Sequence, residues 1–390
     1  MSINFSKFKK TTLFVLYIIG FIFAFTSSIP AYVNSSFLAS LTSQQSIGIF
    51  YTISAIFSLI SLLYIPRLLK KFGNYKVTLL LSILYFLNFI GIALIPNVFF
   101  VLFCYVLSGA FASVLYFNFD IFIEHNSTDE KTGEIRSIYL TCINFAWLFS
   151  PWLAGIIVEE FSYRMIYLLV ALILIPVIFI ILFKLKSFKD KEYTTFNFFE
   201  TIKSVKGNKN ITNIIIAAFL LQFFYSWMVV YSPIYLNQVV GFNWITSGLI
   251  FSIALIPFVV VQVPLGYLAD KKIGEKEMLV TGFILMGIFT LIIPLVHGNS
   301  FIFWTAILFM GRLGAAIVEV MADTYFFKNI TDKNLNVINL YRTVSPFAYI
   351  IGPISASVIM IFLPFNSIFY ILGFLMIVSI QYVWAIKDTK

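Results

Sequence analysis

Apolar runs of about 20 residues alternate along the chain with short polar segments. Each run is long enough to cross the roughly 30 Å apolar core of a bilayer as an α-helix. Charged residues, Gly, Pro and Asn delimit the runs. The pattern predicts twelve helices, near residues 11–33, 46–66, 77–95, 98–119, 137–158, 164–183, 211–236, 246–268, 278–296, 300–323, 338–362 and 366–386.

The polar segment between the sixth and seventh runs is longer than the other gaps and divides the chain. Between Lys184 and Asn210 it carries seven lysines against three acidic residues and contains no apolar run. We therefore expect an N-terminal six-helix bundle over residues 1–184, a cytoplasmic linker over 185–210, and a C-terminal six-helix bundle over 211–390.

Composition places the chain in the bilayer. Hydrophobic residues make up 61% of it, charged residues only 11%, and the mean hydropathy is +0.97. A soluble domain has about a quarter charged residues. This balance leaves no room for a sizeable soluble domain and predicts an all-α membrane protein.

Basic residues lie on alternate loops, and this distribution predicts the orientation. Loops that are translocated to the outer side of the membrane avoid Lys and Arg, whereas cytoplasmic loops keep them. The termini, the linker and one set of alternate loops hold 24 of the 26 basic residues, and Arg164 and Arg312 are the exceptions. Both termini are expected in the cytoplasm. The membrane is expected to be a prokaryotic plasma membrane. The net charge of +9 follows from this orientation and does not indicate nucleic-acid binding.

Two glycine-bearing, charged turns occupy equivalent gaps in the two halves, residues 66–73 and 266–276. Other residues match at an offset close to 200: Ser150, Pro151 and Ala154 with Gly352, Pro353 and Ala356, and Tyr32 with Tyr235. Several matches at one offset indicate a duplication, which is a common origin of transporter folds. The halves are expected to be pseudo-symmetric.

The second turn resembles the signature of the major facilitator superfamily, Gly-x-Leu-Ala-Asp followed by a basic residue and a further Gly. The matching residues are Gly266, Leu268, Ala269, Asp270, Lys271 and Gly274. The first copy departs from it, because Pro66 replaces the Gly and Lys70 the Asp. The resemblance implies two six-helix bundles, a central cavity lined mainly by the first, fourth, seventh and tenth helices, and alternating access by rocking of the bundles.

The turn also predicts a set of gating residues. An acidic side chain at a cytoplasmic helix end is stabilised by the positive end of a neighbouring helix. We expect Asp270, between Gly266 and Gly274, to form such a clasp with the start of the fifth helix, where Arg136 adds a basic partner. A solvated loop charge is the alternative. Asp323 and Arg342 flank the loop between the tenth and eleventh helices. We expect them to form a salt bridge at the membrane–water interface and include them among the gating residues.

Only the tenth helix carries ionisable groups well inside its apolar run. Arg312 lies about 18 Å along that helix, near the middle of the bilayer. It is interpreted either as a receptor for an anionic or polar substrate or as a structural counter-ion. Glu319, two turns further along the same face, is a candidate for binding a coupling proton. The alternative for Glu319 is a structural network with Asp270 and Lys276.

Further binding candidates lie on the helices expected to line the cavity. Gln222, Gln262 and Asn144 are amides in apolar runs and need partners there. Trp147 and Tyr32 join them, although aromatic side chains also serve as interface belts or packing.

Groupings typical of catalysis or metal binding are not found in the sequence. Cys104 and Cys142 lie in separate apolar runs, and His125 and His297 are isolated on opposite sides of the expected membrane. We therefore expect no metal, no cofactor and no enzymatic activity. The sequence predicts a monomeric, proton-coupled secondary active transporter whose partners are a small solute, the proton and the lipid bilayer. An integral-membrane enzyme, a lipid-handling protein and a non-transporting receptor are the alternatives.

Overall fold

The computed structural model describes residues 2–126, 132–186, 188, 190, 205, 207–261, 264, 274–329 and 335–387. The helices of the first half are α1 (Ser2–Ala31), α2 (Asn34–Leu41), α3 (Ile47–Phe72), α4 (Asn74–Leu94), α5 (Val98–Asn126), α6 (Thr132–Glu160) and α7 (Tyr163–Lys184). Those of the second half are α9 (Lys209–Ile234), α10 (Trp244–Ala254), α11 (Ile256–Val260), α13 (Glu275–Ile292), α14 (Phe301–Lys328), α15 (Leu335–Arg342), α16 (Val344–Phe362), α17 (Ser367–Val378) and α18 (Ile380–Trp384).

The predicted fold class is confirmed. Within the described residues, 11 helices are long and apolar enough to cross a membrane, and a shorter apolar helix spans Trp244–Val260. That shorter helix covers the start of the predicted run 246–268, whose end lies largely outside the described residues. The described part of the chain contains no β-strand.

Several helix ends differ from the prediction. The helix expected to end at residue 66 continues through Pro66 to Phe72, α5 reaches Asn126, and α14 reaches Lys328. The apolar pattern marks only the part of a helix that lies in lipid, whereas the backbone hydrogen bonds continue into the polar region. The loop expected over residues 34–45 contains the short helix α2.

The last glycine of each copy of the duplicated turn has the same backbone geometry. Gly73 has φ 82° and immediately precedes α4, and Gly274 has φ 86° and immediately precedes α13. Residues with a Cβ rarely adopt this left-handed region. Gly73 and Gly274 therefore share a conformation at the start of the helix that follows each turn.

An acidic side chain lies beside each turn, but it comes from a different part of the chain in each half. Glu275, at the start of α13, is 1% exposed and pairs with Lys328 at the end of α14 (Oε1 to Nζ, 2.5 Å). At the start of α4, the backbone N–H of Asn74 donates to Oδ1 of Asp190, which lies in the segment after α7 (2.8 Å). A carboxylate thus meets the N-terminus of each of these helices, where the helix dipole stabilises it.

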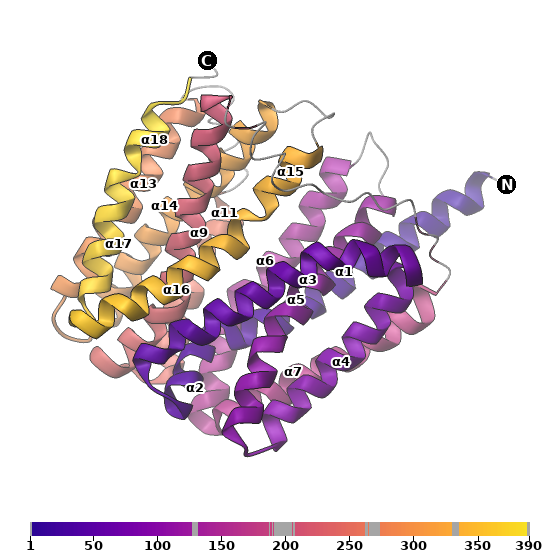
Figure 1. The fold of residues 1–390 in the computed structure, drawn as a ribbon, viewed down its shortest axis with the longest axis horizontal. Coiled ribbons are helices and arrows are strands. Elements are labelled where there is room, and N and C mark those ends of the chain that lie inside the picture. The colour runs from indigo at the N-terminus through magenta and orange to yellow at the C-terminus, as the bar shows by residue number, and fades with distance from the viewer. Residues whose placement is uncertain are drawn as a thin grey trace.

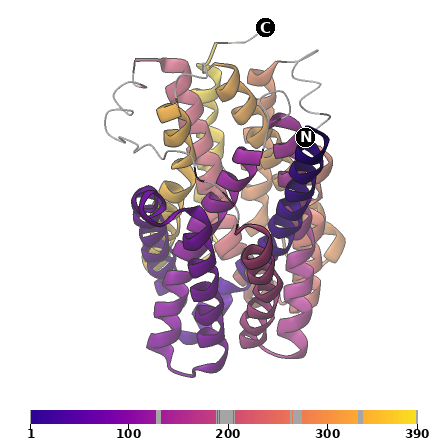
Figure 2. The same cartoon turned by 90° about the vertical axis from the view of Figure 1, so that its right-hand side faces the viewer.

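The helices form two groups that lie side by side (Figure 1). Helices α9, α13, α14, α17 and α18 gather on one side, and α1 and α3 to α7 on the other. One large apolar core belongs mostly to each group. The C-terminus and the start of α1 lie towards the same end of the molecule (Figure 2), and we name the opposite end, where α1, α4, α6, α9, α13 and α16 finish, the distal side.

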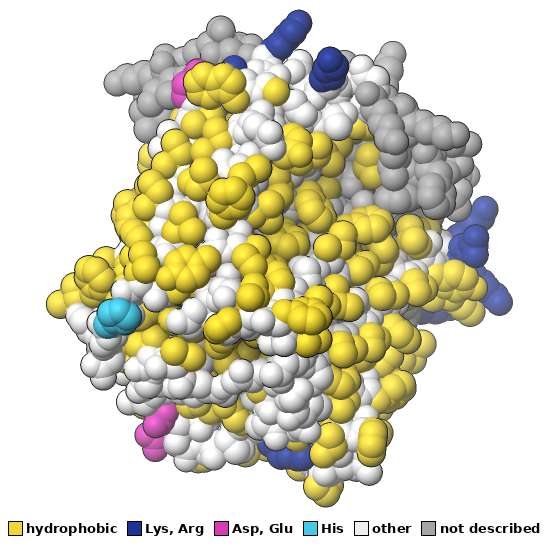
Figure 3. Space-filling model, turned by 60° about the vertical axis from the view of Figure 1, so that its left-hand side comes forward, with side chains coloured by type: hydrophobic (Ala, Val, Ile, Leu, Met, Phe, Trp, Pro, Cys, Tyr) yellow, Lys and Arg dark blue, Asp and Glu magenta, His cyan; other side chains and the backbone are white. Residues whose placement is uncertain are grey.

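The outer surface is apolar where lipid is expected. Figure 3 shows hydrophobic side chains over the middle of one face, with basic side chains mainly near its edges. Large side chains such as Phe99, Ile302 and Phe362 are more than three-quarters exposed. Such a surface would be unfavourable in water and is stable in the hydrocarbon core of a bilayer.

Two helix crossings join the halves, α3 with α16 and α6 with α10. A Cβ on Gly48 of α3 would collide with the carbonyl oxygen of Pro353, and a Cβ on Gly248 of α10 would collide with that of Pro151. Gly48 and Gly248 are 200 positions apart. The two contacts are therefore pseudo-symmetric, and each requires a residue without a side chain.

Candidate functional site

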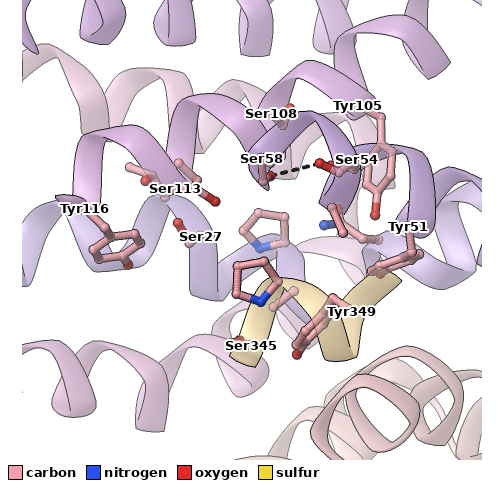
Figure 4. Close-up of a pocket in the computed structure, with 18 of the residues that line it drawn as sticks. Ser27, Tyr51, Ser54, Ser58, Tyr105, Ser108, Ser113, Tyr116, Ser345 and Tyr349 are labelled. Carbon is pink, nitrogen blue, oxygen red and sulfur yellow. Dashed lines mark hydrogen bonds between the residues drawn. The ribbon is translucent and has the colours of Figure 1, made fainter. Parts of the chain in front are cut away.

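A cavity of about 450 Å³ lies between the halves and is built mostly by the first half. Of its 25 lining residues, 20 come from α1 to α7, and the other five are Val229 of α9, Arg342 of α15, and Ser345, Pro346 and Tyr349 of α16. Figure 4 shows part of the lining, with Ser345 and Tyr349 facing side chains of the first half across the space. The volume falls within the roughly 300–1,000 Å³ typical of small-molecule sites.

Hydroxyl groups dominate the polar lining of this cavity. The aliphatic ones belong to Thr26, Ser27, Ser54, Ser58, Ser108, Ser113 and Ser345. The phenolic ones belong to Tyr51, Tyr85, Tyr105, Tyr116, Tyr167 and Tyr349. Among the described residues that line the cavity, Arg342 is the one charged residue.

Trp147 and Arg342 are the two sequence-predicted site residues that line the cavity. The lining includes no residue of α14, so Arg312 and Glu319 lie outside it. Sequence reasoning did not select the serines of α3, although Ser54 and Ser58 are four residues apart and so share one face of the helix. This spacing is the feature of the sequence that indicates a polar face on the helix.

Arg312 lies in a separate, closely packed site within the second half. It is 4% exposed, and its guanidinium carbon lies 5.9 Å from the ring centre of Phe224 and 5.7 Å from that of Tyr225, both on α9. These distances are typical of cation–π contacts. One terminal nitrogen of Arg312 is buried without a hydrogen-bond partner. A buried donor without a partner is costly, so this nitrogen could still bind an acceptor group.

Tyr225 connects Arg312 with Glu319. Its hydroxyl donates a hydrogen bond to Oε2 of Glu319 (2.7 Å), while its ring faces the Arg312 guanidinium. The seven-residue spacing on α14 brings both charged side chains to the same neighbour on α9. The sequence alone does not identify Tyr225 as a site residue, because an aromatic residue in an apolar helix resembles ordinary packing.

The C-terminal part of α14 carries a second acidic group. Oδ1 of Asp323 accepts a hydrogen bond from the hydroxyl of Tyr341 (2.6 Å), and the Tyr341 ring stacks on Phe326 (4.0 Å between centres). Arg342, the neighbour of Tyr341, is exposed and lines the cavity. Asp323 and Arg342 therefore lie at the junction between α14 and the cavity wall.

The other sequence-predicted residues are distributed over the interface and the core. Tyr32 is 3% exposed and stacks on Phe251 of the other half (4.9 Å between centres). Asn144 and Gln222 are half-buried and do not line the cavity. Gln262, Gly266 and Asp270 lie outside the described residues, as does the side chain of Arg136 in α6. The clasp predicted between Asp270 and Arg136 therefore stays a prediction.

Several hydrogen bonds join the halves towards the distal side. The backbone N–H of Gly48 donates to Oγ of Ser357 (3.1 Å), and the hydroxyl of Thr52 donates to the carbonyl of Ile350 (2.8 Å). At the other crossing, the N–H of Trp152 donates to Oγ of Ser252 (3.2 Å) and that of Trp244 to Oε2 of Glu159 (2.8 Å). The side-chain amide of Gln44 also donates to that of Gln238. These contacts join the two halves towards the distal side.

The described residues contain no group of three or more His, Cys, Asp or Glu side chains that could hold a metal ion. Cys104 and Cys142 are free thiols within helices of the first half. The chemistry available in the described sites is therefore hydrogen bonding, ring stacking and charge pairing.

Comparisons with known proteins agree with this architecture. The family model described as Major Facilitator Superfamily matches residues 16–328 and 246–390. Among solved structures, a crystal structure of a mutant of the nucleoside transporter NupG is similar with a TM-score of 0.76 at 13% identity, covering 97% of this chain and 99% of that chain. At that identity the likeness concerns the fold. No curated protein is similar enough in sequence to count as a relative.

Proposed function

The chain belongs to the major facilitator superfamily, a family of secondary transporters, and we propose that it moves a small solute across the membrane by alternating access, coupled to protons. The observation that carries the coupling is the Tyr225 contact between the buried Arg312 and Glu319. The bundles over residues 1–184 and 211–390 are the moving parts in this proposal, and the linker over 185–210 joins them.

The cavity supports a route for the solute. It lies between the halves and is large enough for a small molecule, and the contacts that close the distal side all join one half to the other. If the bundles rock, these contacts break and the cavity becomes accessible from the distal side. In the proposed orientation the distal side faces away from the cytoplasm, because the basic loops and both termini lie at the opposite end.

Glu319 supports proton coupling because its contacts change with its charge. As a carboxylate it accepts the hydrogen bond from Tyr225 and lies along α14 from the Arg312 cation. When protonated it loses its negative charge and can itself donate a hydrogen bond. Protonation therefore alters how α9 and α14 are held together, which is the link between a proton and a conformational change that coupling requires.

The remaining predicted residues have roles in the same proposal. Gly266, Asp270, Gly274 and Arg136 form the clasp that closes the cytoplasmic side, with Asp323 and Arg342 at the adjoining helix ends. Gln222, Gln262, Asn144, Trp147 and Tyr32 provide polar and aromatic contacts along the path of the solute or proton. The protein acts as a monomer in a prokaryotic plasma membrane.

The test is solute uptake into proteoliposomes across an imposed pH gradient. NupG is a nucleoside transporter, so nucleosides are among the first solutes to screen. Wild type should accumulate its solute when the gradient is present. The variant Glu319→Gln should lose accumulation but still exchange solute across the membrane, because the path remains and the titrating group is gone.

The matched control is Glu277→Gln, which neutralises an exposed carboxylate in the first turn of α13. It should accumulate solute as wild type does. Equal accumulation by Glu319→Gln and wild type under the same gradient would disprove the coupling role of Glu319. Failure of wild type to transport any solute in a broad screen would contradict the transporter function itself.

A further inference from the structure

Four of the seven serine and threonine hydroxyls of the cavity donate their protons to backbone carbonyls, Ser54 to that of Val106 on α5 (3.1 Å) and the other three within their own helices. Thr26 donates to the carbonyl of Phe23 (2.6 Å), Ser58 to that of Ser54 (2.9 Å), and Ser108 to that of Cys104 (2.9 Å). A hydroxyl has one proton and two acceptor lone pairs. The cavity surface therefore presents oxygen acceptors and favours a solute that brings hydrogen-bond donors.

Three further hydroxyl oxygens, those of the lining residues Ser27, Tyr51 and Tyr116, are buried and make no hydrogen bond of good geometry, although Tyr116 lies near Ser27 and Tyr51 near Tyr105. Figure 4 shows Ser27 and Tyr116 towards one end of the cavity and Tyr51 towards the other. Each can donate or accept. Leaving buried hydroxyls unpaired is unfavourable, so a ligand with polar groups at both ends would stabilise this arrangement.

The charge of the lining argues against ionic solutes. An ammonium group needs a carboxylate or a similar counter-charge when it is buried, and the described lining residues include no Asp or Glu. A carboxylate or phosphate needs a cation or several converging donors, whereas Thr26, Ser54, Ser58 and Ser108 already donate to backbone carbonyls. Arg342 is the one cation there, and it is exposed. The cavity is thus suited to an uncharged molecule.

Aromatic rings supply the apolar part of the surface. Trp147 lies in the wall, and Tyr51 and Tyr105 meet edge to face with ring centres 5.6 Å apart. Aromatic side chains combine a flat apolar face with a polar tip. Such a wall contacts the face of a ring while the surrounding oxygens bind groups at its edge.

We propose that the cavity binds an uncharged ring compound carrying several hydroxyl groups, the chemistry shared by monosaccharides and nucleosides. This specifies the solute class of the proposed transporter and rests on that function for its role in transport. Binding itself depends only on the cavity.

The first test measures binding to the purified full-length protein in detergent, without a gradient, by isothermal titration calorimetry. The probes are glucose and uridine, with glucuronate, uridine monophosphate and glucosamine as their charged counterparts. At least one uncharged probe should bind, and its charged counterpart should bind at least about tenfold more weakly because the cavity cannot compensate a buried charge. Glucose and uridine distinguish the two sources of the shared chemistry.

Two variants locate the site. Tyr116→Phe removes a buried hydroxyl with little change of shape, and Ser58→Ala removes an acceptor. Each should weaken binding of the uncharged probe about fivefold or more, as expected for one lost hydrogen bond. The control is Ser82→Ala: Ser82 is buried and donates to the carbonyl of Thr78 (2.8 Å), as Ser58 does to Ser54, but does not line the cavity.

Binding of neither uncharged probe at millimolar concentration would overturn the proposal, and so would preferential binding of the charged probes. Unchanged affinity in both cavity variants would also overturn it. The outcomes are separable from those for the proposed function. Proton-driven transport of an anion would preserve the transporter function and refute the solute class, whereas binding of a sugar or nucleoside without any transport would do the reverse.

Discussion

The hydroxyl of Tyr225 on α9 donates a 2.7 Å hydrogen bond to Glu319 on α14, and the ring of the same tyrosine lies 5.7 Å from the guanidinium of Arg312. One uncharged side chain therefore contacts both the buried Arg312 and the partly buried Glu319. A change in the charge of either residue therefore alters a contact that Tyr225 of α9 makes.

Tyr225→Phe separates the two contacts of this tyrosine. The ring and its cation–π contact remain, while Glu319 loses its donor. We expect proton-driven accumulation to fall and the protein to lose about 1 kcal/mol of stability, because a partly buried acceptor loses its donor. Uptake in proteoliposomes and thermal unfolding in detergent measure the two effects. Wild-type accumulation by Tyr225→Phe would show that the hydrogen bond has no part in coupling.

Arg312→Lys tests whether the guanidinium itself is required. A lysine keeps the charge but is more strongly hydrated and cannot place a planar cation against Phe224 and Tyr225. We expect uptake to fall about tenfold or more, since the buried ammonium cannot recover the two ring contacts. The control is Arg67→Lys, because the exposed Arg67 lies over the ring of Tyr64 (5.3 Å). A similar loss in both variants would contradict a specific role for Arg312.

Gly48→Ala and Gly248→Ala test the closure of the distal side. The added methyl group collides with the carbonyl oxygen of Pro353 in the first case and of Pro151 in the second. Overpacking of this kind costs about 1–3 kcal/mol, and here it acts only when the halves are in contact. Both variants should therefore favour conformations in which the distal side is open.

Cysteine crosslinking measures this shift. Gln44 and Gln238 are joined by a side-chain hydrogen bond on the distal side, so the pair Gln44→Cys and Gln238→Cys should crosslink readily in an otherwise wild-type protein. Adding Gly48→Ala or Gly248→Ala should slow the crosslink. Gly311→Ala is the control, because a Cβ there would meet only Phe289 at an ordinary 3.7 Å. Equal crosslinking rates in all four proteins would refute the closure model.

Lys328→Met tests the ion pair at the second glycine turn. Glu275 is 1% exposed, and the change removes the cation 2.5 Å from its carboxylate. We expect a loss of about 1–3 kcal/mol, less than for a fully buried pair because Lys328 is partly exposed. Thermal unfolding in detergent provides the measurement. Lys328→Met combined with Glu275→Gln should recover part of the loss, and no recovery would argue against the ion pair as its cause.

Hydrophobic patterning sufficed to predict the helices, because the bilayer requires long apolar runs whatever their packing. It did not predict where the helices end: α3 passes through Pro66 and ends at Phe72, beside Gly73. Proline removes a backbone donor but leaves the rest of the helix intact when neighbouring groups compensate. The end therefore depends on Gly73 and on the contacts around it.

Arg312 was identifiable from the sequence because a charge within an apolar run is rare and costly. The cavity was not, because its serines and tyrosines are common in membrane helices and acquire meaning only when α1, α3 and α5 bring them together. The buried charge of α14 predicts a site in the second half, whereas the cavity is built mainly by the first half.

The sequence by itself determined the membrane class, the two related halves, the paired glycine turns and the helix that carries buried charge, since each depends on local composition or on a repeat along the chain. Only the tertiary structure decided that Tyr225 contacts both Arg312 and Glu319, that Gly48 and Gly248 let the two halves pack closely, and that a hydroxyl-lined cavity lies apart from Arg312 and Glu319. These relationships join helices distant in sequence. Their geometry depends on how the helices pack, which no single apolar run encodes.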